Sequence, residues 1–279
     1  MENNQNVKEL VKEKYSEIAL QSKTTNASSC CGAGGCSTID LEIMSENYTS
    51  LEGYFADADL GLGCGIPTEF AQIKKGDTVV DLGSGAGNDA FVARSIVGED
   101  GRVIGIDMTE KMIELARNNA TKLQLQNVEF RLGDIENIPI TSNKADVVVS
   151  NCVLNLVPDK VKAFSEMYRI LKPGGHFSVS DIVLSGTLPN EIIKEAEMYA
   201  GCVSGAIQKN DYLKIIQQNG FSNITINKEK EIILPDDILS NYLSAEQIAA
   251  FKNSGTGIFS ITVFGEKPKD CGCGTECCN

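Results

Sequence analysis

Two kinds of residue in this sequence have chemistry worth locating: a glycine run flanked by carboxylates, and a set of ten cysteines. Gly83, Gly85 and Gly87 lack a Cβ, so the backbone there can approach a ligand closely. Asp81 precedes these glycines, where its carboxylate suits an ammonium group. Asp107 ends the next apolar run, a position that suits a carboxylate binding ribose hydroxyls. The stretch therefore indicates a cofactor site.

The spacing of these glycines argues against a dinucleotide. The G-x-G-x-x-G fingerprint fails because position 88 is Asn, and Asp81 would repel a pyrophosphate. The pattern favours a cofactor that is cationic at one end and carries a ribose at the other. Taken alone, a glycine run also fits a strand-to-helix crossover that binds nothing.

The cysteines fall into two terminal clusters and three single positions. The clusters are Cys30/Cys31/Cys36 and Cys271/Cys273/Cys277/Cys278, and the single residues are Cys64, Cys152 and Cys202. A lone cysteine is most often an ordinary buried residue. These three, however, lie beside glycines or at the expected end of a strand. If they meet, three soft thiolates suit pyramidal As(III) or Sb(III) better than a catalytic zinc. The single histidine, His176, nearly excludes histidine-based sites and favours a surface or structural role for that residue.

Strand–helix alternation from Gly76 predicts a parallel α/β sheet that positions these residues. The expected strands are 78–82, 102–107, 127–132, 145–150 and 176–183, with helices 88–97, 109–123 and 159–171 between them. Helices are also expected at 6–20, 191–200 and 211–219. A mostly helical stretch is expected at 43–72, with an interruption by a loop at 60–67, where Pro67 would start a short helix to Ile73. Two further strands, 224–234 and 259–266, would add antiparallel edges. Ligands bind at the carboxyl ends of such strands, where the polar groups are Asp81, Asp107, Asp134, Asn151 and Cys152.

Composition excludes several functions. The 279-residue chain has a net charge of −13, which opposes nucleic-acid binding. It has no long apolar run for a membrane span, and its first residues lack a secretory signature. We therefore expect a cytoplasmic monomer with no membrane partner. In a reducing compartment, its cysteines favour soft-metal binding or redox chemistry over a disulfide framework.

Five segments resemble the arsenite S-adenosylmethionine (SAM)-dependent methyltransferases, a likeness that runs from about residue 45 to about residue 265. They are Asp81–Gly85, Gly105–Met108, Gly133–Pro139, Ser150–Leu156 and Tyr199–Ala206. The resemblance implies that Cys152 and Cys202 hold As(III), with Cys64 as the third thiol, while Cys30 or Cys31 forms a redox pair with Cys64. It also implies cofactor binding by the following residues: Asp81, Gly83, Gly85, Asp107, Met108, Gly133, Asp134, Ile135, Glu136 and Asn151.

The implied activity is methyl transfer from SAM to thiolate-bound As(III), with arsenite or a thiol-conjugated As(III) as substrate, thioredoxin or glutathione as reductant, and no structural metal. The family usually places an aromatic residue near the Gly-Cys-Gly loop. Leu62 stands there, so Tyr48 or Tyr54 is the expected substitute. The alternatives are a SAM-dependent methyltransferase of a small organic acceptor, and a thiol-rich metalloid-binding protein that uses the C-terminal cysteines.

The expected fold is α/β: a class I, Rossmann-like methyltransferase sheet with helices on both faces and a C-terminal α+β addition. Residues 1–40 would form an N-terminal helix and a cysteine-rich mobile loop, and 41–184 the SAM-binding domain. Residues 185–268 would form the arsenic-binding region, and 269–279 a flexible cysteine-rich tail.

Overall fold

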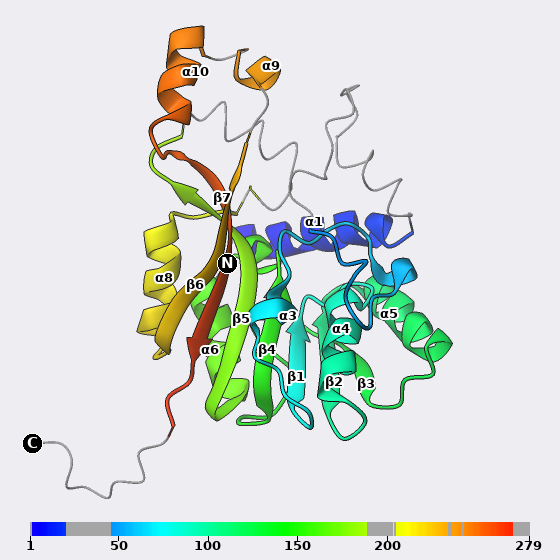
Figure 1. Ribbon diagram of the computed structural model, residues 1–279. Helices are drawn as coiled ribbons and strands as arrows, with labels where there is room; N and C mark the ends of the chain where they lie inside the picture. Colours follow the sequence, from blue (N-terminus) through cyan, green and yellow to red (C-terminus); the bar gives the residue numbers. More distant parts are fainter. Residues whose placement is uncertain are drawn as a thin grey trace, which may run out of the picture.

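The computed structural model describes residues 2–20, 46–188, 203, 205–233, 236–240 and 243–269. A seven-stranded sheet in the order β3-β2-β1-β4-β5-β7-β6 forms its centre (Figure 1). The strands are β1 (Thr78–Leu82), β2 (Arg102–Asp107), β3 (Val128–Leu132), β4 (Ala145–Asn151), β5 (Leu171–Ser185), β6 (Ser222–Ile232) and β7 (Gly257–Glu266). The first five pair in parallel, while β7 and β6 add antiparallel edge strands as predicted. The structure thus confirms the α/β class.

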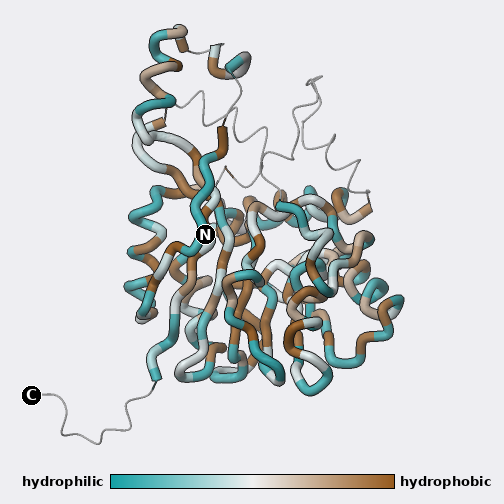
Figure 2. The backbone as a smooth tube through the Cα atoms, in the orientation of Figure 1, coloured by the Kyte–Doolittle hydropathy of each residue, from teal (hydrophilic) through white to brown (hydrophobic). Residues whose placement is uncertain are grey.

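Helices precede, connect and follow these strands. They are α1 (Glu2–Ile18), α3 (Pro67–Phe70), α4 (Asn88–Val97), α5 (Glu110–Lys122), α6 (Lys160–Ile170), α8 (Lys209–Gln218), α9 (Asp236–Leu239) and α10 (Ala245–Lys252), with 3₁₀ turns η2 (Ala56–Ala58) and η3 (Leu154–Leu156). One face of the sheet packs on α6 and α8, and the other on α4 and α5. Alternate residues of a strand point to opposite faces, so Val79 joins one core and Val80 the other. Figure 2 shows apolar residues following the strands between the two helical layers.

Hydrophobic periodicity placed the central elements well. The predicted bounds of β1, α4 and β2 match the structure, those of β3 and β4 differ by one residue at one end, and those of α5 and α6 differ by one residue at each end. β5 begins at Leu171, earlier than predicted, and a change of register with a positive φ of 80° at Gly174 marks a bend before His176. His176 has a structural role, since its Nε2 lies 2.7 Å from the carbonyl oxygen of Ala71. The helix predicted at 191–200 lies outside the described residues.

The prediction of mostly helical structure over 43–72 is wrong for its described part, 46–72, although the predicted interruption before Pro67 is present. Only the short η2 and α3 are helical there, and α3 ends at Phe70 rather than at the predicted Ile73. Gly53 and Gly61 have positive φ values of 87° and 72°, which interrupt any helix. Side chains hold this segment instead: the Tyr54 hydroxyl donates to Asp59 Oδ2 at 3.1 Å. The apolar residues at helical spacing here serve loop packing, a case that periodicity alone cannot distinguish.

No helix among the described residues combines the length and the apolar character that crossing a membrane requires.

Candidate active site

An open cavity lies at the carboxyl ends of the parallel strands. Its volume is about 1170 Å³, which includes the solvent space at its mouth. Helix α1 crosses this edge of the sheet (Figure 1) and contributes Lys8, Val11 and Tyr15 to the cavity wall. Eight of the ten predicted cofactor residues line the cavity: Asp81, Gly83, Gly85, Asp107, Met108, Asp134, Ile135 and Asn151. Four separate strands therefore deliver polar groups to one place, as the parallel topology requires.

Gly133 and Glu136 do not line the cavity. A Cβ at Gly133 would lie 2.6 Å from the Pro139 ring, so this glycine is needed for a close turn. The Glu136 carboxylate accepts hydrogen bonds from Lys8 at 2.6 Å and from the backbone N–H of Asp159 at 3.0 Å. Both residues shape the loop, and a direct cofactor contact for either stays a prediction.

Three buried polar oxygens in the cavity wall have no hydrogen-bond partner: Asp81 Oδ2, Ser84 Oγ and Asn88 Oδ1. Buried polar atoms are normally satisfied, so unsatisfied ones in a cavity indicate a ligand. Asp81 is only 2% exposed. Burial, Asp89 and Asp107 together raise the pKa of Asp81 well above its usual value. A cation would relieve this repulsion, so the wall fits a ligand with an ammonium or sulfonium group.

Asp107 fixes the glycine loop to the start of α5. Its Oδ2 accepts from the backbone N–H of Gly85 at 3.0 Å, and its Oδ1 from that of Thr109 at 2.8 Å. Burial raises the pKa of Asp107, although these N–H groups oppose the shift. The carboxylate sits where strand β2 ends beside the cavity, which fits a ligand with vicinal hydroxyls.

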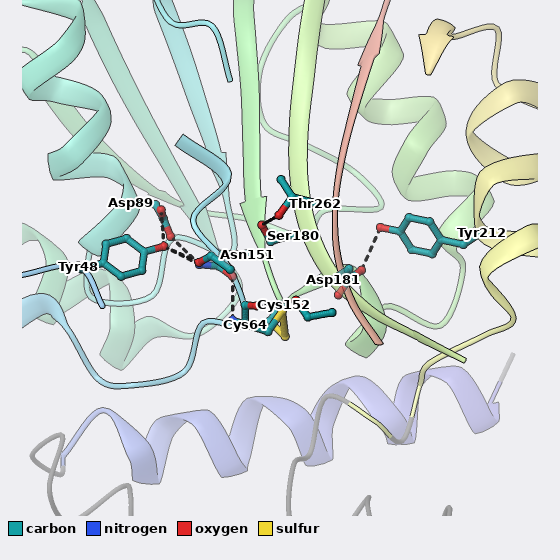
Figure 3. Close-up of a disulfide and its surroundings, with 11 residues drawn as sticks. Tyr48, Cys64, Asp89, Asn151, Cys152, Ser180, Asp181, Tyr212 and Thr262 are labelled. Carbon is teal, nitrogen blue, oxygen red and sulfur yellow. Dashed lines mark hydrogen bonds between the residues drawn. A yellow bond between two sulfur atoms is a disulfide. The ribbon is translucent and has the colours of Figure 1, made fainter. Parts of the chain in front are cut away.

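A buried network that sequence reasoning missed joins three segments (Figure 3). The Tyr48 hydroxyl lies 2.9 Å from Asp89 Oδ1 and accepts from Asn151 Nδ2 at 2.8 Å. Asn151 Nδ2 also donates to Asp89 Oδ2 at 3.1 Å. Burial raises the pKa of Asp89 to about 6, although the Asn151 and Tyr48 hydrogen bonds oppose the shift. Asp89 follows the glycine run within the first turn of α4, and that position was its only sequence signal.

Of the two tyrosines proposed to replace the missing aromatic residue, Tyr48 lines the cavity. Tyr54 does not, and it bonds to Asp59 instead. Leu62 also lines the wall. Of the two candidates, Tyr48, from a segment before the sheet, is therefore the one that lies at the cavity, and its contact with a cofactor stays a prediction.

The backbone of Cys64 is held from both sides by side chains of the sheet. Its N–H donates to Asn151 Oδ1 at 3.0 Å, and its carbonyl accepts from Ser260 Oγ at 2.6 Å. A Cβ at Gly63 would lie 2.6 Å from Asn151 Nδ2, and one at Gly65 would overlap Ser180 Oγ. The glycines around Cys64 therefore permit a close backbone approach to the sheet.

Cys152 lies directly after β4 and joins Cys64 in a disulfide with 5.7 Å between the Cα atoms (Figure 3). Residues 88 positions apart in the sequence are thus brought together. Cys152 has a φ of 60°, which is unfavourable for a side chain with a Cβ and often marks a functional position. Its N–H donates to the Ser180 carbonyl at 2.7 Å, and the residue also lines the cavity. Its sulfur therefore belongs beside the cofactor site.

The thiols are more buried than their glycine-rich and strand-end contexts predicted. Cys64 is 1% and Cys152 3% exposed, within an apolar cluster that also contains Ile182, Val203 and Ile258. The strands β5 and β7 enclose the loop, and sequence spacing does not reveal such long-range packing. Cys202, Cys30 and Cys31 lie outside the described residues, as do the C-terminal cysteines. Val203, the neighbour of Cys202, packs in the same cluster as both described thiols.

The Cys64 partner in the structure is Cys152, whereas the family resemblance paired Cys64 with Cys30 or Cys31. That pairing stays a prediction, because both N-terminal residues lie outside the described part of the chain.

Lys8 links α1 to the loop after β3. Its Nζ donates to Asp134 Oδ2 and to Glu136 Oε2, each at 2.6 Å. Burial lowers the pKa of Lys8, but the hydrogen bonds and charges of the two carboxylates outweigh it and raise the pKa overall. Helix α1 is therefore held over the cavity by a charged contact that no sequence pattern predicts.

Comparisons with known proteins agree with this site. A methyltransferase domain family matches residues 73–220. The chain is 38% identical to the arsenite methyltransferase of Halobacterium salinarum, over 94% of this chain and 66% of that protein. It is 31% identical to that of Aquipseudomonas alcaligenes, over 84% and 68%. A crystal structure of an arsenic(III) S-adenosylmethionine methyltransferase from Chlamydomonas reinhardtii superposes with a TM-score of 0.60 at 33% identity, covering 75% of this chain and 68% of that one. The chain spans about two thirds of the length of each of these proteins.

Proposed function

Because this chain belongs to the arsenite methyltransferase family, we propose that it transfers a methyl group from SAM to arsenic(III) held by cysteine thiolates. The observation that carries the proposal is the position of Cys152. This residue belongs both to the wall of the cofactor cavity and to a thiol pair with Cys64. The position of this cysteine pair, with Cys152 in the cavity wall, supports a soft-metalloid site next to the methyl donor.

The cavity fits SAM by charge and shape. Asp81 is suited to the ammonium group and Asp107 to the ribose hydroxyls, while Asp134 and Ile135 lie where the adenine is expected. Tyr48 and Asn151 hold Asp89 and the Cys64 loop against this site. When bound, SAM supplies an electrophilic methyl group and leaves with the electron pair of the broken carbon–sulfur bond. The residues of the chain therefore act by positioning and by excluding water.

Arsenite is a neutral hydroxide that exchanges its oxygens for sulfur. Three thiols, from Cys64, Cys152 and Cys202, would replace three hydroxyl groups and release three water molecules. The apolar cluster around Cys64 and Cys152 favours this neutral, soft complex over the hydrated oxyacid. Val203 in the same cluster supports the approach of Cys202. The arsenic lone pair then serves as the nucleophile, so no general base is required.

Methylation formally raises arsenic to As(V), and two electrons restore As(III). Two thiolates supply these electrons by forming a disulfide, which an external dithiol or glutathione then reduces. The Cys64–Cys152 disulfide supports a redox pair within the site itself. Cys30 or Cys31 would be the alternative partner for Cys64. Thioredoxin or glutathione as reductant, and a cytoplasmic location, stay predictions.

The test is methyl transfer from radiolabelled SAM to arsenite with reduced protein, followed by separation of the methylated arsenicals. Wild type is expected to yield labelled methylarsenicals. Cys152→Ser is expected to yield none while still binding SAM. As the control, Cys278→Ser, at the C-terminus, should keep full activity. Label transfer to a small organic acceptor but not to arsenite would contradict the proposal, and so would full activity in Cys152→Ser.

A further inference from the structure

A buried polar pair behind the thiol site has no role in the reaction described above. Asp181 on β5 and Tyr212 on α8 are both fully buried, and the tyrosine hydroxyl donates to Asp181 Oδ2 at 3.0 Å (Figure 3). The second oxygen, Asp181 Oδ1, has no hydrogen-bond partner. A buried carboxyl group is costly, so its presence in the core calls for an explanation.

Asp181 is linked to the segment that follows Cys152. Its neighbour Ser180 accepts the Cys152 N–H at 2.7 Å. Burial raises the pKa of Asp181, and the Tyr212 hydroxyl, the charge of Lys160 and the backbone N–H groups of Ile182 and Asn155, in η3, oppose the shift. Lys160 Nζ donates to the Asn155 carbonyl at 3.2 Å. This carbonyl, three residues after Cys152, is thus fixed in place.

The same carbonyl touches the segment that follows Cys202. A Cβ at Gly205 would overlap the Asn155 carbonyl oxygen, so only glycine allows this contact. Gly205 lies three residues after Cys202, in a turn where the Ala206 N–H donates to the Val203 carbonyl at 3.0 Å. The chain then enters α8, which Tyr212 anchors to Asp181. Both cysteine-bearing segments therefore meet at one backbone contact.

We propose that the Asn155–Gly205 backbone contact and the Asp181–Tyr212 pair form a clamp that fixes the segment after Cys202 (Val203 and Gly205) against the segment after Cys152, and that this clamp supports three-thiolate binding of arsenite. This inference rests on the proposed function, because it assumes that Cys64, Cys152 and Cys202 bind arsenic. None of the clamp residues touches arsenic; they are positioning residues. Their effect is to raise the effective concentration of the third thiol at an arsenic atom that already has two.

Two arsenicals separate the third thiol from the first two. Arsenite can take three thiolates, whereas phenylarsenous acid, with one valence used by carbon, takes two. Cys64 and Cys152 lie together without the clamp, since the Asn151 and Ser260 hydrogen bonds hold Cys64. Disruption of the clamp should therefore weaken arsenite binding and spare phenylarsenous acid.

The main variant is Gly205→Ala, whose methyl group would push against the Asn155 carbonyl. We expect at least a tenfold loss of arsenite affinity in the reduced protein, with phenylarsenous acid and SAM affinities within twofold of wild type. Gly257→Ala is the matched control, because its Cβ would meet neighbours no closer than 3.4 Å. It should match wild type for both arsenicals.

Tyr212→Phe is the second variant, and it decides the question if Gly205→Ala does not fold. Removal of the hydroxyl leaves the Asp181 carboxyl without its side-chain donor, and a several-fold, arsenite-selective loss is expected. Unchanged arsenite affinity in the folded variants, or equal losses for both arsenicals, would overturn the clamp. Wild type that binds neither arsenical would instead overturn the proposed function.

Discussion

The two halves of the site differ in chemistry and in origin. The cofactor half is rich in buried carboxylates, and most of its groups come from short motifs at successive strand ends between 81 and 151. The thiol half is an apolar cluster that brings together Cys64, Cys152 and Val203 with side chains of β5 and β7. A charged ligand needs charged groups that a local motif can supply. A soft ligand needs several sulfurs at once, which requires distant segments to meet.

Replacement of Cys202, the third proposed thiol, is expected to have the largest effect that distinguishes the thiol half from the cofactor half. Cys202→Ser should lower arsenite methylation by at least a thousandfold, because arsenic then lacks one of its three soft ligands, while SAM affinity stays within twofold. Initial rates of label transfer and calorimetric titration with SAM measure the two effects. A parallel loss of SAM affinity would show that the two halves are not separable.

The pH dependence of stability tests the protonation of Asp181, the buried carboxyl group next to the thiol half. Burial raises the pKa of Asp181 to about 7, although Tyr212 and the charge of Lys160 oppose the shift. A raised pKa means that folding takes up a proton between about pH 4 and 7, so this group's contribution to stability falls as pH rises through that window.

Asp181→Asn removes this proton uptake and keeps an acceptor for the Tyr212 hydroxyl. The stability of the variant relative to wild type should therefore rise by a few kcal/mol between pH 4.5 and pH 7.5, at about 1.4 kcal/mol per pKa unit. Urea unfolding at several pH values measures it, and groups common to both proteins cancel. Parallel stability curves would show that Asp181 titrates normally.

In the cofactor half, Asp81→Asn should weaken SAM about 10- to 100-fold, the usual effect of losing a charge-assisted hydrogen bond. Phenylarsenous acid should still bind with wild-type affinity, which is the converse of the Cys202→Ser result. Equilibrium binding of each ligand to the same protein checks both. Unchanged SAM affinity would remove Asp81 from the cofactor site.

The smallest expected effect concerns the helix over the cavity. Lys8→Met should weaken SAM only two- to fivefold, because the Lys8 contacts with Asp134 and Glu136 are partly solvent-exposed. Lys12→Met is the matched control, since Lys12 contacts only Glu110 among the described ion pairs, at 3.6 Å on an exposed surface. A loss that persists undiminished in high salt would contradict an electrostatic contact.

Much of the cofactor half could be predicted, because its information is local. Short continuous apolar runs set β1 and β2, glycines mark the turn, and the parallel topology places Asp81 and Asp107 at one edge. Gly133 and Glu136 were placed in the cavity by family resemblance, yet the first is needed for a turn and the second binds Lys8. Spacing gives the position of a loop but not the direction in which each side chain points.

The sequence by itself determined the α/β order of elements, the strand-end carboxylates and the presence of three separate thiols in special contexts. Only the tertiary structure decided that Cys64 forms a disulfide with Cys152, that Tyr48 and Asn151 hydrogen-bond to Asp89, and that α1 lies over the cavity. The physical reason is the range of the interactions. Periodicity and glycine turns depend on neighbours along the chain, whereas these contacts join residues from tens to more than a hundred positions apart and exist only once the sheet has formed.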